Sequence, residues 1–242
     1  MEIVNNIHII IAAVVLLGVL TLFAPLEEIK AEGEENEADC PYAAGKKSIW
    51  QFPHLVLGAL AIFFHVGSQV IAIDTLIQYA GTMGLDMLEA KVFPSYTLTC
   101  TMLGYLIGIA LIPKYLSQKN ALVLCTLLGL VLSLCAVLVD VPLTFMGHRI
   151  NASLLFLNAL GLPNALIYAG IWPLAIRGLG RHTKLGSSLL IMGLCGNAIM
   201  PQIYGLIADN YSLRAGYWIL IPCFIYLIWY ALHGHKIEYW KK

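Results

Sequence analysis

The chain has 242 residues, of which 60% are hydrophobic and only 12% are charged. Soluble domains carry about 25% charged residues, so this composition cannot cover a water-soluble globule and excludes a cytosolic enzyme. The formal net charge is zero, which gives no support for nucleic-acid binding, because that function needs a basic patch. The mean hydropathy of +0.80 and the long apolar blocks indicate a chain that crosses the membrane several times.

Seven apolar blocks are long enough to cross the bilayer as helices, which takes roughly 20 residues each. In chain order they cover about 7–25, 52–80, 93–113, 120–140, 150–176, 187–208 and 214–232. The blocks are continuously apolar, whereas the strands of a membrane barrel alternate with a period of two. The sequence therefore predicts an all-α membrane protein with seven transmembrane helices.

The distribution of lysine and arginine predicts the orientation, because cytoplasmic loops carry the excess of these residues. Seven spans divide the loops into two sets, one with eleven basic residues and one with three. The larger set comprises Lys30, Lys46, Lys47, Lys114, Lys119, Arg177, Arg181, Lys184, Lys236, Lys241 and Lys242, and the smaller set comprises Lys91, Arg149 and Arg214. We therefore expect the N-terminus outside and the C-terminus in the cytoplasm.

One long polar stretch, 26–51, separates the first span from the other six and contains seven acidic residues. Such a stretch is typical of a solvated linker. The predicted organisation is a transmembrane helix within 1–25, a cytoplasmic linker over 26–51, a six-helix bundle over 52–232 and a cytoplasmic tail over 233–242. The bundle divides into two three-helix groups, 52–140 and 150–232, which is the pattern of a secondary transporter repeat, although any six evenly spaced helices would produce it.

Two stretches resemble a known family. Residues 168–209 read YAGIWPLAIRGLGRHTKLGSSLLIMGLCGNAIMPQIYGLIAD, which resembles the tenth and eleventh helices, with their joining loop, of the fucose:proton symporter family of the major facilitator superfamily. The matching positions are Tyr168, Leu174, Ile176, Leu179, Gly180, Thr183, Lys184, Gly186, Ser187 and Ser188. The runs 64–69 and 76–80 are similar to the seventh helix of that family.

The resemblance implies a fold and a function. Family members have twelve helices, and this chain matches helices 6–12, so we expect a truncated transporter that corresponds mainly to the C-terminal half. The family implies import of a monosaccharide, of the fucose, glucose or galactose class, across the inner membrane by symport with a proton or sodium and by alternating access. It implies no cofactor, and the family's coupling carboxylates would lie in the missing half. The chain departs from the family pattern at His65, Ile73, Asp74, Ala169 and Pro173. The resemblance therefore does not identify which sugar is carried.

A sugar-binding cavity needs hydrogen-bonding amides and aromatic rings at membrane depth, where an unpaired polar group is costly. Within 150–176, Asn158, Asn164, Tyr168 and Trp172 fall within about 120° of one another on a helix. Pro163 removes one backbone hydrogen bond beside them. We predict that this stripe borders the cavity, and the alternative is ordinary interhelical packing through amides.

Polar residues of two other spans complete the predicted site. Gln69 and His65 lie one turn apart in 52–80, where Gly67 and Ser68 would permit local unwinding, and Asn197 lies near the middle of 187–208. Gln69 and Asn197 are predicted substrate contacts. His65, Asp74 and Gln78 are accessory polar candidates, and for His65 an interhelical hydrogen bond is the alternative. Asp74 lies near the outer interface, which argues against a coupling role.

Other classes of function have weaker support. A complete seven-helix receptor or sensor has the same orientation, but a retinal protein would need a lysine in its last span, and 214–232 has none. A membrane-embedded enzyme would need clustered acids, histidines or a nucleophile at depth, so we expect no catalytic residues. The six cysteines form no CxxC pair, and neither a disulfide nor a metal site is expected.

Overall fold

The structure is a computed structural model that describes residues 43, 46–112, 114–145 and 147–240. The predicted span 7–25 and most of the linker 26–51 lie outside the described residues. Six helical spans long and apolar enough to cross a membrane occupy Pro53–Gly81, Met87–Leu111, Gln118–Leu138, Ala152–Ile176, Gly180–Asn210 and Leu213–Lys236. The six predicted spans from 52–80 onward are thereby confirmed.

Most of the spans are built from two or more helical pieces. The α-helices are α2 (Pro53–Asp74), α3 (Leu76–Gly81), α4 (Met87–Ala90), α5 (Phe93–Leu111), α6 (Gln118–Leu138), α7 (Ala152–Ala159), α8 (Gly161–Ile176), α9 (Thr183–Met192), α10 (Gly196–Asn210), α11 (Leu213–Gly216) and α12 (Leu220–Leu232). Short 3-10 turns are η1 (Ile49–Gln51), η2 (Gly180–His182), η3 (Gly193–Cys195), η4 (Tyr217–Ile219) and η5 (Gly234–Lys236).

The starts of several helices follow from local sequence. Pro53 opens α2 at a position where its missing N–H costs nothing. Ser117 accepts a hydrogen bond from the backbone N–H of Asn120 and so caps α6, and Asn151 caps α7 in the same way through Ser153. These caps place the helix ends near the ends of the apolar blocks, as the composition predicts.

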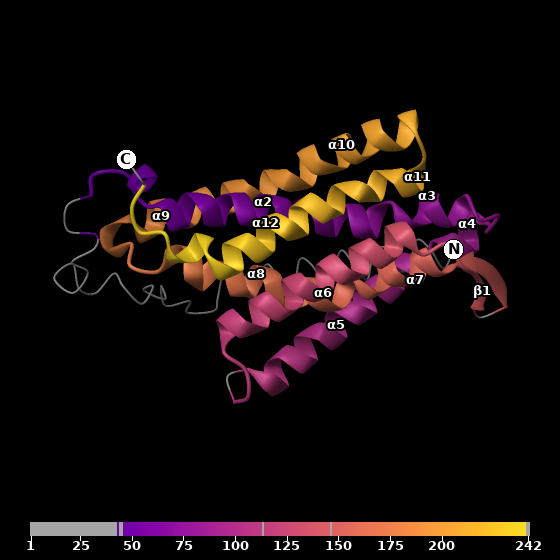
Figure 1. Cartoon of the computed structure of the whole chain (residues 1–242), viewed down its shortest axis with the longest axis horizontal. Helices are drawn as coiled ribbons and strands as arrows, with labels where there is room; N and C mark the ends of the chain where they lie inside the picture. Colours follow the sequence, from indigo (N-terminus) through magenta and orange to yellow (C-terminus); the bar gives the residue numbers. More distant parts are fainter. Residues whose placement is uncertain (1–42, 44–45, 113, 146, 241–242) are drawn as a thin grey trace, which may run out of the picture.

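The helices form two layers (Figure 1). In the first, α10 packs on α2, α2 on α8, and α8 on α5; we call this row the four-helix layer. In the second, α12 and α6 pack against each other, with α12 lying on α2 and α6 on α8; we call this pair the two-helix layer. Within the described part of the chain, the two-helix layer therefore covers one side of the four-helix layer, and we call the other side the uncovered side.

Glycines allow the backbones of the four-helix layer to approach closely. A Cβ on Gly196 of α10 would lie 2.1 Å from the carbonyl oxygen of Phe63 in α2, and one on Gly161 of α8 would lie 2.2 Å from that of Thr97 in α5. Small residues at membrane helix interfaces permit this kind of packing. Both contacts are with backbone, so they set the spacing of α10 from α2 and of α8 from α5.

The two ends of the bundle differ. At one end, here the hairpin end, strands β1 (Pro142–Phe145) and β2 (His148–Asn151) form an antiparallel hairpin, and Gly147 in the turn has φ +89. The other end, here the basic end, carries most of the described lysines and arginines, and the C-terminal residues lie there (Figure 1). The hairpin is a local departure from a purely helical chain.

Two predictions about helix breaks have different outcomes. The span 152–176 does break beside Pro163, between α7 and α8 at Leu160. The local unwinding that Gly67 and Ser68 would permit is not present, because α2 runs through both without interruption and its span breaks at Thr75 instead. Gly67 makes room for the side chain of Met200, to which a Cβ would come within 2.3 Å.

Candidate functional site

The predicted stripe on α8 combines a buried amide with two stacked rings. Asn164 is 3% exposed, and its Oδ1 has no hydrogen-bond partner among the described residues. One and two turns further on, the rings of Tyr168 and Trp172 lie 5.7 Å apart between centroids, with an angle of 34° between their planes. Both aromatic side chains are half-buried. We call these three residues the α8 ridge.

The ridge aromatics face away from the two-helix layer. Gly170 is the point at which α8 meets α6, because a Cβ there would lie 3.0 Å from the Cβ of Leu122. Tyr168 and Trp172 are each two residues from Gly170, which places them about 160° around the helix from it. Their partly exposed rings therefore belong to the uncovered side of the four-helix layer.

On α2, the predicted residues divide between core and surface. His65 is fully buried, and its Nδ1 has no hydrogen-bond partner in the part of the chain that the structure describes, so the alternative of a satisfied interhelical histidine has no support at that atom. Gln69 is half-buried. Asp74 and Gln78 are exposed on either side of the break at Thr75, and the span continues beyond both residues to Gly81.

The remaining two candidates have different surroundings. Asn158 is buried, and its Oδ1 accepts a hydrogen bond of 3.0 Å from the hydroxyl of Thr97 in α5. Interhelical packing through an amide therefore describes part of its role, although its Nδ2 has no partner in the described ranges. Asn197 is exposed on α10.

All of the predicted site residues come from the four-helix layer and its extensions α3 and α7. The structure thus brings them to one layer of the bundle, but no hydrogen bond joins any two of them in the described part of the chain. Three of them, His65, Asn158 and Asn164, each keep a buried polar atom that no described residue pairs with. Such atoms are uncommon in protein interiors, and they are the groups that a hydroxylated ligand or a water molecule would satisfy.

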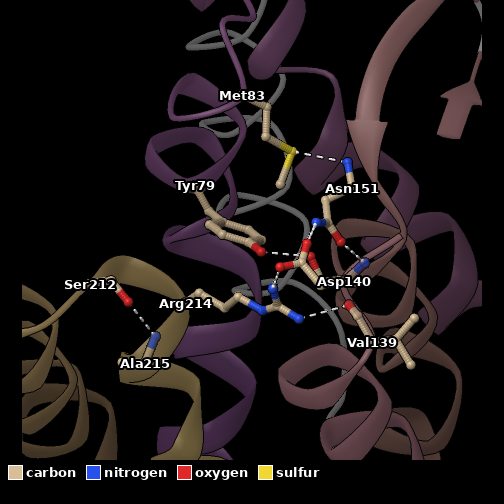
Figure 2. A network of polar contacts seen from close by, with 9 residues as sticks. Tyr79, Met83, Val139, Asp140, Asn151, Ser212, Arg214 and Ala215 are labelled. Carbon is tan, nitrogen blue, oxygen red and sulfur yellow. Dashed lines mark hydrogen bonds and ion pairs between the residues drawn. The ribbon is translucent and has the colours of Figure 1, made fainter. Parts of the chain in front are cut away.

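A polar network at the hairpin end was not predicted as a site (Figure 2). Arg214, in α11, forms an ion pair of 2.7 Å with Asp140, which follows α6, and donates a hydrogen bond of 2.8 Å to the carbonyl of Val139. The side-chain amide of Asn151 donates to Asp140. Nearby, the hydroxyls of Tyr79 and Ser153 lie 2.6 Å apart.

Electrostatics at Asp140 follow from these contacts. The amide of Asn151 and then the guanidinium of Arg214 hold the pKa of the Asp140 carboxyl below its ordinary value, because both stabilise the ionised form. From the sequence alone, Arg214 was interpreted only as a marker of orientation. The signal that could have revealed the network is a pair of opposite charges at the ends of two different spans on one side of the membrane.

A second cluster closes the basic end. The ammonium of Lys46 lies 4.3 Å from the ring centre of Phe52 and 4.9 Å from that of Tyr239, and it donates to the carbonyl of Glu238 at 3.1 Å. Burial lowers the pKa of Lys46. His182 is 3.0 Å from the Lys46 carbonyl, so this cluster joins the segment before α2 to the loop before α9 and to the C-terminal tail.

Several sugar transporters are similar to this chain over most of its length, although no family model matches it. A glucose/galactose transporter of Brucella abortus (strain 9-941) is 33% identical over 205 residues, which are 83% of this chain and 47% of that protein. A putative glucose/galactose transporter of Helicobacter pylori (strain J99) is 28% identical over 92% of this chain and 54% of that protein. The L-fucose-proton symporter of Escherichia coli (strain K12) is 26% identical over 83% of this chain and 44% of its own length.

Solved structures agree with these matches. The crystal structure of a variant of the E. coli fucose:proton symporter FucP has a TM-score of 0.76 and 25% identity, and the match covers 94% of this chain and 54% of that one. The resemblance to the fucose:proton symporter family is confirmed. The fold is that of a major facilitator transporter, also by comparison with FucP in the outward conformation (TM-score 0.75, 24% identity).

Two further points follow from the comparisons. The chain spans about half the length of the curated relatives it matches. Those relatives are named as transporters and symporters, in agreement with the expectation that the chain is not an enzyme. With six apolar helices in the described part of the chain and this fold, the chain is a multi-pass membrane protein.

Proposed function

We propose that the chain forms one wall of a monosaccharide transporter that works by symport and alternating access. The observation that carries this proposal is the α8 ridge, an unpaired buried amide and two stacked rings on the side of the four-helix layer that α6 and α12 do not cover. A pyranose offers hydroxyls to the amide and an apolar face to the rings. The relatives named for glucose, galactose and fucose support the substrate class.

In this mechanism Asn164 and Gln69 hold sugar hydroxyls, and Tyr168 and Trp172 pack against the ring. Asn158 and Asn197 add polar contacts at the edges, with His65, Asp74 and Gln78 as accessory groups. The opposite wall is a second bundle, corresponding to the half of the relatives that the chain does not match. Rocking of the two bundles around the site exposes it to each side of the membrane in turn.

The coupling ion is a proton or sodium, and the residues that bind it belong to that second bundle. We assign the hairpin end to the outside and the basic end to the cytoplasm, because the described basic residues gather at the latter. With 52–232 as the transport bundle, 26–51 is then the cytoplasmic linker and 233–242 the cytoplasmic tail of an inner-membrane protein.

The test is uptake of labelled D-glucose, D-galactose and L-fucose into vesicles, using the gene product with all coding sequence contiguous to this chain, under an imposed proton or sodium gradient. We expect accumulation of at least one of these sugars and none by the isolated chain. Asn164→Ala and Gln69→Ala should each weaken sugar affinity by about 5- to 150-fold, as loss of about 1–3 kcal/mol of hydrogen bonding predicts.

A matched control is Asn120→Ala, which removes an exposed amide at the start of α6 and should leave affinity unchanged. Thermal unfolding should show that Asn164→Ala folds normally, because the Oδ1 that it removes has no partner. Unchanged affinity in both site variants would reject the α8 ridge as the sugar site. Accumulation by the isolated chain would reject the two-wall arrangement.

A further inference from the structure

The hairpin end contains a pocket that the proposed sugar site does not use. It has a volume of about 380 Å³ and is open at the molecular surface. Its walls are the end of α6 with Val137, Leu138 and Asp140, and the start of the last span with Arg214, Ala215 and Trp218. These elements lead into the two-helix layer, so the pocket lies on the opposite side of the bundle from the α8 ridge.

The polar part of the pocket carries one positive and one negative charge. The Arg214 and Asp140 side chains are 23% and 69% exposed, so the ion pair is accessible to a ligand. The guanidinium Nη1 and Nη2 bind Asp140 and Val139 (Figure 2), while Nε is buried and has no partner among the residues that the structure describes. Because the two charges cancel, a purely anionic or cationic ligand meets repulsion from one of them. A dipolar ligand finds a partner for each end.

The apolar part of the pocket continues onto the adjoining helices. Leu138 and Trp218 at its rim are exposed, and so are Val131 of α6 and Ile225 of α12 further from the hairpin end. Tryptophan is enriched at the level of lipid head groups, where one edge of its ring is apolar and the other is wet. The pocket therefore joins a neutral pair of charges to an exposed apolar surface on α6 and α12.

We propose that this pocket binds the head group of a zwitterionic phospholipid with a primary ammonium, such as phosphatidylethanolamine. The phosphodiester accepts hydrogen bonds from the guanidinium of Arg214, and the ammonium donates to the carboxylate of Asp140. The acyl chains lie along α6 and α12. A choline head group has the same charges but no N–H to donate, so it fits the Asp140 end less well.

The experiment measures binding of single lipids to the purified chain in detergent by native mass spectrometry, with thermal unfolding in parallel. The probes are phosphatidylethanolamine, phosphatidylcholine and phosphatidylglycerol with identical acyl chains, and the water-soluble glycerophosphoethanolamine. We expect phosphatidylethanolamine to bind at least ten-fold more tightly than the other two lipids. We expect no binding of the soluble head group at the same concentration.

Variants test whether this preference comes from the pocket. Ala215→Trp fills the pocket without changing either charge and should abolish the preference, whereas Ala110→Trp, at an exposed position of α5, is the matched control and should retain it. Asp140→Asn should make the ethanolamine and choline lipids bind equally. The proposal is overturned by equal binding of these two lipids to the unaltered chain, by a preference that survives Ala215→Trp, or by equal binding of the soluble head group, which would indicate a soluble ligand.

Discussion

The two sides of the bundle treat polar side chains differently. Along α6, the hydroxyls of Thr126 and Ser133 are buried and donate hydrogen bonds to carbonyls of their own helix. The exposed side chains in the same stretch include Leu124, Leu127 and Val131. On the four-helix layer, by contrast, α10 exposes the amides of Asn197 and Gln202, and α8 presents the half-buried Tyr168 and Trp172.

The difference follows from the cost of exposing polar groups to hydrocarbon. An amide facing hydrocarbon without a partner costs several kcal/mol, so a helix that faces lipid hides its polar groups, as α6 does. A helix that exposes amides in the middle of a span faces water or another protein surface. The α5 and α9–α10 spans are also the least buried of the described spans. In their most apolar stretches 22% and 28% of the residues are buried, against 44% for α6. An exposed helix surface can face either lipid or another protein surface. The exposed amides on α10 indicate that its surface does not face lipid.

The largest expected effect comes from placing a charge on each side. Leu127→Asp, in the middle of α6, should destabilise the inserted chain by about 2.5–3.5 kcal/mol, the cost of an aspartate at the centre of a membrane helix. Leu194→Asp, at an exposed position of η3 beside α10, should cost much less. Resistance of the membrane-inserted chain to unfolding by a denaturing detergent measures both, with Leu127→Ala as the size control. Equal destabilisation by Leu127→Asp and Leu194→Asp would contradict the claim that the two sides face different surroundings.

Packing within the four-helix layer gives the next effect. Gly196→Ala should destabilise the chain by about 1–3 kcal/mol, because its Cβ would strike the backbone of Phe63, which cannot move alone. Gly205→Ala, in the same helix, meets nothing within 4 Å and should stabilise by about 0.5–1 kcal/mol through helix propensity. Thermal unfolding compares them. A similar change in both would contradict the close contact between α10 and α2.

The smallest effect concerns pH at the hairpin end. The pKa of Asp140 is lowered in the folded chain, so its contribution to stability is complete above the ordinary aspartate value of about 3.9 and is lost as the pH falls through the folded-state pKa. The melting temperature of the unaltered chain should therefore fall more steeply below about pH 4 than that of Asp140→Asn. Parallel curves would contradict the shift.

The membrane fold was largely predictable, because a hydrocarbon environment requires long apolar helices and hydropathy detects them. Six of the predicted apolar blocks coincide with helices to within a few residues except at Met87 and Gly180, where helix begins earlier than hydropathy indicates. Hydropathy registers only the apolar part of a span, and the polar residues of 87–92 and 180–186 obscure the start. The hairpin at 142–151 is too short to show a clear alternating pattern.

The candidate site was predictable only in part. The periodicity of 3.6 places Asn164, Tyr168 and Trp172 on one stripe, and the structure keeps them together. It could not show that Asn158 lies beyond a break and binds Thr97 of another helix, because such a contact depends on which helices are neighbours. The Asp140–Arg214 pair was missed for the same reason, since the two groups lie far apart in the sequence and only the fold brings them together.

The central claim is that the α8 ridge borders water, and thiol accessibility tests it most directly. Single cysteines at Trp172 and Asn197, and at Leu127 and Ile225 on the two-helix layer, would be introduced into a chain whose native cysteines are replaced. A membrane-impermeant maleimide reacts with a hydrated thiolate, so the first pair should react at least ~10-fold faster than the second. In the complete transporter, bound sugar should slow the reaction of Trp172→Cys. Fast labelling at Leu127 and Ile225, with none at Trp172, would show that the ridge faces lipid and would contradict the account.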